Sequence, residues 1–122
     1  MVTLKSNSNS NLWIGGAILF SGRSDPQWIL EEEQAEELMQ IWNRLPSAPG
    51  NIIIPNILGY KGCYISTNNK KKWITFRGKV TCYENGIAIE SRIDSGRVFE
   101  KKIIETAPEN AIPKAMLIEE FE

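Results

Sequence analysis

Histidine is absent from this chain. The imidazole ring is the commonest general base and metal ligand near neutral pH, so its absence excludes Ser-His-Asp sites, Cys-His sites and most zinc sites. The chain also lacks a G-x-S-x-G segment and a glycine-rich phosphate-binding motif. We therefore expect a protein without a recognisable catalytic apparatus, and we expect no metal ion and no cofactor.

Cysteine is scarce, and long apolar runs are missing. Cys63 and Cys82 are the only cysteines and do not have C-x-x-C spacing, so we interpret both as small buried core residues with reduced thiols. No apolar run approaches the length of a membrane span, and the polar stretch 1–11 does not resemble a signal peptide. The sequence therefore predicts a cytoplasmic protein without membrane contact, with a flexible N-terminus at 1–11.

The composition is that of a folded protein with almost balanced charge. Apolar residues make up 42% and charged residues 24% of the 122 residues, and the net charge is −1. This balance is typical of a globular chain, and the length fits one domain, which we place at 12–122. Because the chain has no overall positive field, we do not expect nucleic acid as a partner.

The clearest predicted element is a helix over 31–45. Glutamates occupy its first turn, where negative charge suits the helix dipole, and Pro46 ends it. One apolar stripe recurs at helical spacing. The stripe consists of Ala35, Leu38, Met39, Trp42 and Leu45.

An apolar run predicts a strand over 12–20, and 58–66 is also expected to be a strand. Alternating apolar residues predict strands over 73–83 and 87–93. In 73–83 we expect Ile74, Phe76, Val80 and Cys82 to share one face. The Asn85-Gly86 pair predicts a tight hairpin turn, whereas 67–72 is expected to be a polar turn. The Gly15-Gly16 pair is typical of a bulge or of a close backbone approach.

Towards the C-terminus, Asp94-Ser95-Gly96 is a turn that can cap a helix over 97–107. For 111–122 a short helix and an added strand both stay open. The order β-α-β-β-β-α predicts an α+β fold, in which a mostly antiparallel sheet of about four strands carries two helices on one face.

Residues 20–28 form the most distinctive segment, FSGRSDPQW. Arg23 offers a planar fork of donors for a carboxylate or phosphate, and Trp28 offers a large anchor for a partner. In the alternative interpretation Arg23 pairs with Asp25 or with a glutamate of the following helix, and Trp28 fills the core. We keep Arg23, Asp25 and Trp28 as candidate partner-binding residues.

Residues 58–62, LGYKG, form a second candidate segment. Tyr60 and Lys61 lie between two glycines at the start of a predicted strand, where they could contact a ligand. The alternative is a β-bulge or a tight turn.

Two charged stretches complete the set of candidates. Lys70, Lys71 and Lys72 precede Trp73, a combination found in nucleic-acid binding proteins, but we interpret the lysines as a basic edge that discourages strand pairing. The acidic stretch 31–37 has no metal-binding framework, and we interpret it as a solvated helix face. It could dock the lysine turn of a second copy, so self-association stays open.

Together, FSGRSDPQW at 20–28 and LGYKG at 58–62 resemble a group of small cyanobacterial and proteobacterial proteins. That group shares an F-S-G-R-x-x-P-x-W motif, an acidic helix, an L-G-Y-x-G strand start and a closing helix similar to 94–107. The likeness covers residues 17–107. It implies a similar fold and an important loop at 20–28, and it assigns no activity.

From these observations we expect a non-catalytic accessory or adaptor protein that binds a peptide or protein through a sheet edge and the Arg23/Trp28 loop. Small cyanobacterial proteins of this size include accessory subunits of peptide-modifying enzymes, among them radical SAM spliceases. One form of our hypothesis is therefore a partner subunit of such an enzyme. One alternative is a small enzyme that uses Arg23, Asp25, Tyr60 and Lys61. Another is an immunity protein that neutralises a toxin.

Overall fold

The computed structural model describes residues 12–19, 24–57, 59–68 and 70–122. At its centre is one antiparallel sheet of six strands in the order β3-β2-β4-β5-β6-β7. The strands are β2 (Trp13–Ala17), β3 (Gln27–Ile29), β4 (Cys63–Thr67), β5 (Lys71–Phe76), β6 (Lys79–Glu84) and β7 (Ile87–Ile93). The predicted flexible stretch 1–11 lies outside the described residues.

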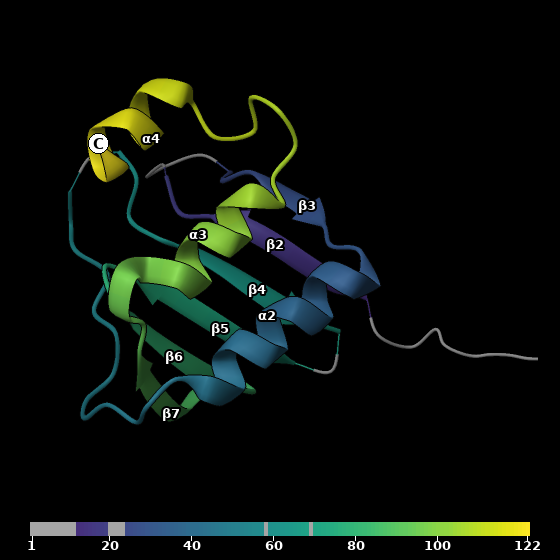
Figure 1. Cartoon of the computed structure of the whole chain (residues 1–122), viewed down its shortest axis with the longest axis vertical. Coiled ribbons are helices and arrows are strands. Elements are labelled where there is room, and N and C mark those ends of the chain that lie inside the picture. Colours follow the sequence, from purple (N-terminus) through teal and green to yellow (C-terminus); the bar gives the residue numbers. More distant parts are fainter. Residues whose placement is uncertain (1–11, 20–23, 58, 69) are drawn as a thin grey trace, which may run out of the picture.

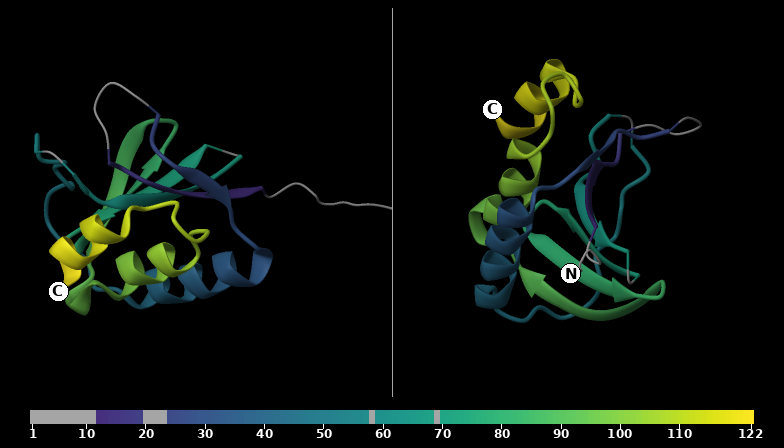
Figure 2. Two further views of the ribbon diagram at one scale, coloured as in Figure 1. Left: turned by 90° about the horizontal axis from the view of Figure 1, so that it is seen from above. Right: turned by 90° about the vertical axis from the view of Figure 1, so that its right-hand side faces the viewer.

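The helices α2 (Glu32–Arg44), α3 (Val98–Glu105) and α4 (Lys114–Phe121) lie on one side of the sheet (Figures 1 and 2). A short 3-10 turn, η1 (Ser95–Arg97), leads into α3. The α+β class with an antiparallel sheet is confirmed. The prediction of about four strands and two helices understates the number of elements. None of the described helices has the length and apolar character needed to span a membrane.

The core lies between the sheet and the helices, where apolar side chains from both layers meet. It includes Leu38, Trp42, Phe99 and Ile103 from the helices and Ile65, Trp73 and Val80 from the sheet. Trp42 contacts both Trp73 and Phe99, with ring centres 6.4 and 6.5 Å apart. These aromatic contacts join the two layers.

Helix α2 agrees with its prediction. Ala35, Leu38 and Trp42 are buried, as the apolar stripe requires. A capping box closes its N-terminus. The Glu31 main-chain N–H donates to the Gln34 side chain at 2.9 Å, and the Glu31 side chain accepts a hydrogen bond from the Gln34 main-chain N–H.

The predicted single strand 73–83 is wrong, because a tight turn divides it into β5 and β6. Arg77 and Gly78 adopt left-handed backbone conformations, with φ of 46° and 94°, and reverse the chain. Cross-strand partners then share a face: Trp73 pairs with Cys82, and Ile74 pairs with Thr81.

The break also corrects the predicted grouping of side chains. Trp73 and Cys82 point to the helices, whereas Ile74 points to the opposite side of the sheet. Ile74 and Cys82 therefore do not share a face. Alternation continues on both sides of the turn, which is why the pattern looks like one strand.

Other differences are smaller. Strand β3 overlaps the end of the loop expected at 20–28, and β5 begins at Lys71, inside the predicted polar turn 67–72. The Asn85-Gly86 hairpin is confirmed, with φ of 53° and 81°. The helix expected over 97–107 is α3, and the open choice for 111–122 is resolved as the helix α4.

The glycine pair in β2 makes room for aromatic rings. Gly15 pairs with Trp28 across the sheet, and a Cβ at Gly15 would lie 2.6 Å from the Trp28 ring nitrogen. Gly16 pairs with Tyr64, and a Cβ there would overlap the Tyr64 ring. The close approach expected at these glycines is therefore made by side chains, one on each face of the sheet.

One sheet edge is short, and the other is partly covered. At one edge β3 has three residues. At the other, 46–48 runs beside the end of β7, where Ala48 N–H donates to the Ser91 carbonyl and Ile93 N–H donates to the Pro46 carbonyl. A bulge interrupts the rest of the β6–β7 pairing. Short or bulged edges discourage pairing with a further chain.

Candidate functional site

The first predicted segment is tied into the protein through its described residues. The Asp25 carboxylate accepts a hydrogen bond from the Leu19 main-chain N–H at 2.8 Å. Trp28 is 6% exposed, and its ring N–H donates to the Thr106 hydroxyl at 2.8 Å. This burial agrees with the interpretation of Trp28 as a core residue. Arg23 lies outside the described residues.

The second predicted segment is also integrated into the fold. Tyr60 is 4% exposed, and its hydroxyl donates to Glu100. Lys61 is half-buried, and its main-chain N–H donates to the Ile18 carbonyl at 2.8 Å, which extends the β2–β4 ladder. Partner binding by Arg23, Asp25, Trp28, Tyr60 and Lys61 stays a prediction.

A buried carboxylate organises the end of the sheet near α3. The Glu100 side chain is completely buried and accepts four hydrogen bonds. Arg97 supplies two of them as a fork, at 2.9 Å each. The Arg77 main-chain N–H supplies the third at 3.0 Å, and the Tyr60 hydroxyl supplies the fourth. The charge of Glu100 is thus fully compensated inside the protein.

The groups beside Glu100 are held in their neutral forms. Burial raises the pKa of the Tyr60 phenol, and the neighbouring Cys63 and Glu100 raise it further. Burial, followed by the charge of Glu100, raises the pKa of the Cys63 thiol well above its ordinary value. A neutral thiol is a poor nucleophile, so this cluster is suited to structural support.

The cysteine prediction is confirmed, because Cys63 and Cys82 are both buried and unpaired by a disulfide. No group of three or more Cys, Asp or Glu side chains in the described parts of the chain could hold a metal ion.

The outer side of this cluster holds the end of α4. Glu120 pairs with the Arg77 guanidinium at 2.7 and 3.0 Å and with Arg97 at 3.0 Å. The next residue, Phe121, lies under Arg97, whose guanidinium carbon is 4.1 Å from the ring centre. We call Tyr60, Phe76, Arg77 and Arg97 the arginine seat.

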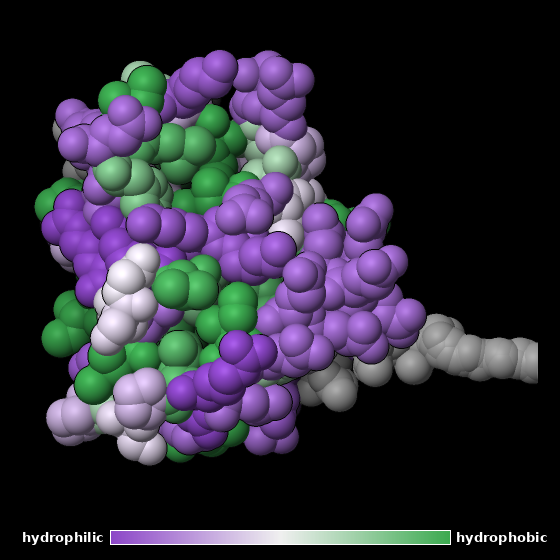
Figure 3. Space-filling view, in the orientation of Figure 1, coloured by the Kyte–Doolittle hydropathy of each residue, from purple (hydrophilic) through white to green (hydrophobic). Residues whose placement is uncertain are grey.

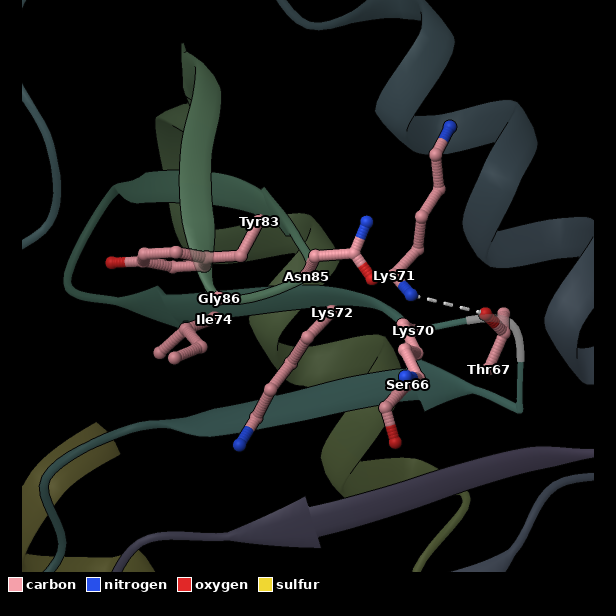
Figure 4. Close-up of a pocket in the computed structure, with 9 residues that line it drawn as sticks. All are labelled: Ser66, Thr67, Lys70, Lys71, Lys72, Ile74, Tyr83, Asn85 and Gly86. Carbon is pink, nitrogen blue, oxygen red and sulfur yellow. Dashed lines mark hydrogen bonds between the residues drawn. The ribbon is translucent and has the colours of Figure 1, made fainter.

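On the sheet face away from the helices lies a pocket of about 560 Å³ (Figure 4). It opens between the β4–β5 and β6–β7 turns, which are joined by a 3.0 Å hydrogen bond from Asn85 N–H to the Lys70 carbonyl. Its lining consists of Ser66, Thr67, Lys70, Lys71, Lys72, Ile74, Tyr83, Asn85 and Gly86. We call it the lysine pocket.

The lysine pocket combines an apolar floor with positive charge. Ile74 and the Tyr83 ring form the floor, and Lys72 projects on the same side of the sheet as Ser66, whereas Lys71 projects to the opposite side (Figure 4). The Lys72 ammonium lies 4.3 Å from the centre of the Tyr64 ring. None of the nine lining residues is acidic.

The lysines of this pocket differ from most arginines of the protein. Arg77, Arg92 and Arg97 form ion pairs with glutamates. Within the described residues, no carboxylate forms an ion pair with Lys70 or Lys72. The pocket is therefore able to accept negative charge from outside the chain.

Comparison with protein-family models, curated proteins and solved structures finds no match for this chain. The motif likeness described above therefore stays a resemblance, and function has to be argued from geometry.

Sequence reasoning missed both the arginine seat and the lysine pocket. The seat gathers residues from three separate segments of the chain, and their types are usually found either at the surface or in an apolar core. The lysine turn was recognised, but the neighbouring floor of Ile74 and Tyr83 required the missed turn at Arg77-Gly78.

Proposed function

We propose that the protein is a non-catalytic binding domain that captures an acidic segment of a peptide or protein partner in the lysine pocket. The observation that carries the proposal is an apolar floor of Ile74 and Tyr83 bordered by Lys70 and Lys72, with no acidic side chain in the lining. A ligand that presents carboxylates around one apolar side chain complements both features.

The size and charge of the surface favour a peptide over a nucleic acid. Its volume of about 560 Å³ fits a few side chains. A nucleic-acid surface combines a wide basic area with several aromatic stacking platforms, whereas this lining contains one aromatic ring, Tyr83, in a chain of net charge −1.

Binding is also favoured over catalysis. No carboxylate, thiol or imidazole lines the lysine pocket beside its hydroxyl groups. The groups best suited to chemistry, Tyr60, Cys63 and Glu100, are buried and bonded to one another.

The same activity fits two of the roles raised by the sequence. An accessory subunit of a peptide-modifying enzyme would bind an acidic leader segment, and an immunity protein would bind an acidic surface of its toxin. Genes that lie beside this one would separate the two hypotheses.

The test uses the full ¹⁵N-labelled chain and an acetylated, amidated Glu-Glu-Leu-Glu-Glu peptide, with Lys-Lys-Leu-Lys-Lys as the control ligand. We expect shift changes confined to 66–74 and 83–87 with the acidic peptide, weakening as salt is raised. The basic peptide should leave these resonances unchanged.

Charge reversal then distinguishes the lysine pocket from the candidate segment 58–62. Lys72→Glu should weaken binding of the acidic peptide about tenfold or more, because it places a like charge in the lining. Lys61→Glu changes the chain charge equally and should leave the affinity unchanged. Absence of binding, equal binding of the basic peptide, or loss of affinity in Lys61→Glu alone would overturn the proposal.

A further inference from the structure

The arginine seat is organised by the core and not by the helix that covers it. Glu100 holds the Arg97 guanidinium by two hydrogen bonds of 2.9 Å and fixes the Arg77 main chain by a third at 3.0 Å. These bonds involve no atom of α4. The Arg97 guanidinium and the Arg77 main chain therefore keep these bonds when α4 is absent, so the core pre-organises this part of the site.

Without α4, the seat would carry uncompensated positive charge. Arg77 and Arg97 contribute two positive charges and Glu100 one negative charge, so one positive charge is left for Glu120 to neutralise. Two guanidinium groups that converge on one carboxylate form a directional receptor for that group.

An aromatic position lies directly beside this carboxylate position. The Phe121 ring is 5.8 Å from the Tyr60 ring and 4.1 Å from the Arg97 guanidinium carbon, centre to centre for the rings. Phe76 contacts Tyr60 from another direction, at 5.9 Å. The seat thus recognises a carboxylate followed immediately by an aromatic residue.

Helix α4 fills the rest of its groove incompletely. None of its residues is fully buried, and Ile118 remains 51% exposed. Hollows of about 200 and 450 Å³ lie between α3 and α4, and Figure 3 shows apolar side chains at the surface in this region. An amphipathic helix with larger apolar side chains would bury more surface there than α4 does.

We propose that the arginine seat and the adjoining α3 groove form a binding site for a helical segment of a partner protein that carries a Glu-aromatic pair. The chain's own α4 occupies this site and is displaced by the partner. The site is separate from the lysine pocket, because the two lie at opposite ends of β5. Failure of either proposal leaves the other standing.

The test keeps the full chain and weakens only its internal competitor. The probe is a fluorescein-labelled peptide of residues 112–122, added to wild type, Glu120→Gln and Glu119→Gln, with binding followed by anisotropy. Glu119 is exposed and lies in the same helix, so Glu119→Gln is the matched control. Circular dichroism establishes that each variant is folded.

We expect Glu120→Gln to bind the peptide about tenfold more tightly than wild type, because apparent affinity rises with the fraction of molecules whose seat is open. Glu119→Gln should match wild type. Adding Arg77→Ala to Glu120→Gln should abolish the gain, since the Arg77 guanidinium that bonds to Glu120 in the intact chain would be missing for the peptide carboxylate.

Hydrogen exchange gives an independent readout. Amides of 114–121 should exchange faster in Glu120→Gln than in Glu119→Gln. Equal peptide affinity in all three proteins, including no binding by any, would overturn the proposal. Full affinity in the Arg77→Ala, Glu120→Gln protein would do the same. Dimerisation of Glu120→Gln that the peptide reverses would replace the separate partner by a second copy.

Discussion

Replacing Glu100 by glutamine tests whether the buried carboxylate is as strongly coupled to its surroundings as its four hydrogen bonds indicate. Glutamine keeps the shape but loses the charge. It also places an NH2 group opposite donors from Arg97, Arg77 or Tyr60. The substitution therefore leaves a guanidinium without its buried partner and brings donors face to face.

The expected loss is about 3 kcal/mol of unfolding free energy, at the lower end of the roughly 3–5 kcal/mol for breaking a buried pair on one side. The lower end applies because Arg97 retains Glu120 at 3.0 Å and has a side chain that is 20% exposed. Such a loss is a large part of the roughly 5–15 kcal/mol that stabilises a domain.

Urea unfolding followed by tryptophan fluorescence measures this loss. With a slope of about 1–3 kcal/mol per molar urea, the midpoint should fall by about 1–3 M at unchanged slope. Glu105→Gln is the control on the same helix, because the Glu105 side chain is 70% exposed and should contribute about 0–1 kcal/mol. A loss below about 1 kcal/mol in Glu100→Gln would refute the reasoning.

Three further predictions concern neighbouring features. The folded-state pKa of Tyr60 is raised, so the stability that its neutral phenol contributes is complete below about pH 10 and is lost at higher pH. In urea titrations, wild type should therefore lose more unfolding free energy than Tyr60→Phe between about pH 9 and 11. Equal losses would contradict this. Gly16→Ala should lower the unfolding free energy by about 1–3 kcal/mol, and by clearly less in a Tyr64→Ala background, where the overlapping ring is gone. A double-mutant cycle that shows no coupling between the two positions would be inconsistent with this packing. Cys63 and Cys82 should react with a thiol reagent only on unfolding, as their burial and raised pKa values require, and rapid labelling of the native protein would argue against both.

The elements that the sequence predicts correctly are those with local signals. The stripe through Leu38 and Trp42 repeats at helical spacing, and Asn85-Gly86 is a pair that readily adopts left-handed backbone conformations. Asp94 also acts as expected, since its carboxylate accepts from N–H groups at the start of α3 at 3.0 and 3.1 Å.

The elements that it misses depend on distant contacts. Nothing local distinguishes Arg77-Gly78 from the middle of an alternating strand. The three-residue β3 exists because Trp28 packs over Gly15 and bonds to Thr106 far along the chain. Tertiary contacts of this kind override local propensity.

The candidate sites follow the same division. Tyr60 stands out in the sequence for its glycine neighbours, but its partner Glu100 lies 40 residues away and looks like an ordinary helix glutamate. The sequence shows the lysine turn and predicts a basic edge that discourages strand pairing. It does not show the apolar floor, which the β5–β6 turn places beside the lysines. A pattern can identify charged residues, but the surface beneath them requires the topology.

Both arginines of the seat have backbone conformations that arginine seldom adopts: φ is 46° at Arg77 and 58° at Arg97. Glycine would relax the main chain at either position, yet it would remove the guanidinium that Glu120 contacts. Selection for thermal resistance and selection for closure of the C-terminal helix should consequently enrich different residues at these two positions. At each of these positions, glycine would favour the stability of the main chain, and arginine favours the contact with the C-terminal helix. The chain carries arginine at both.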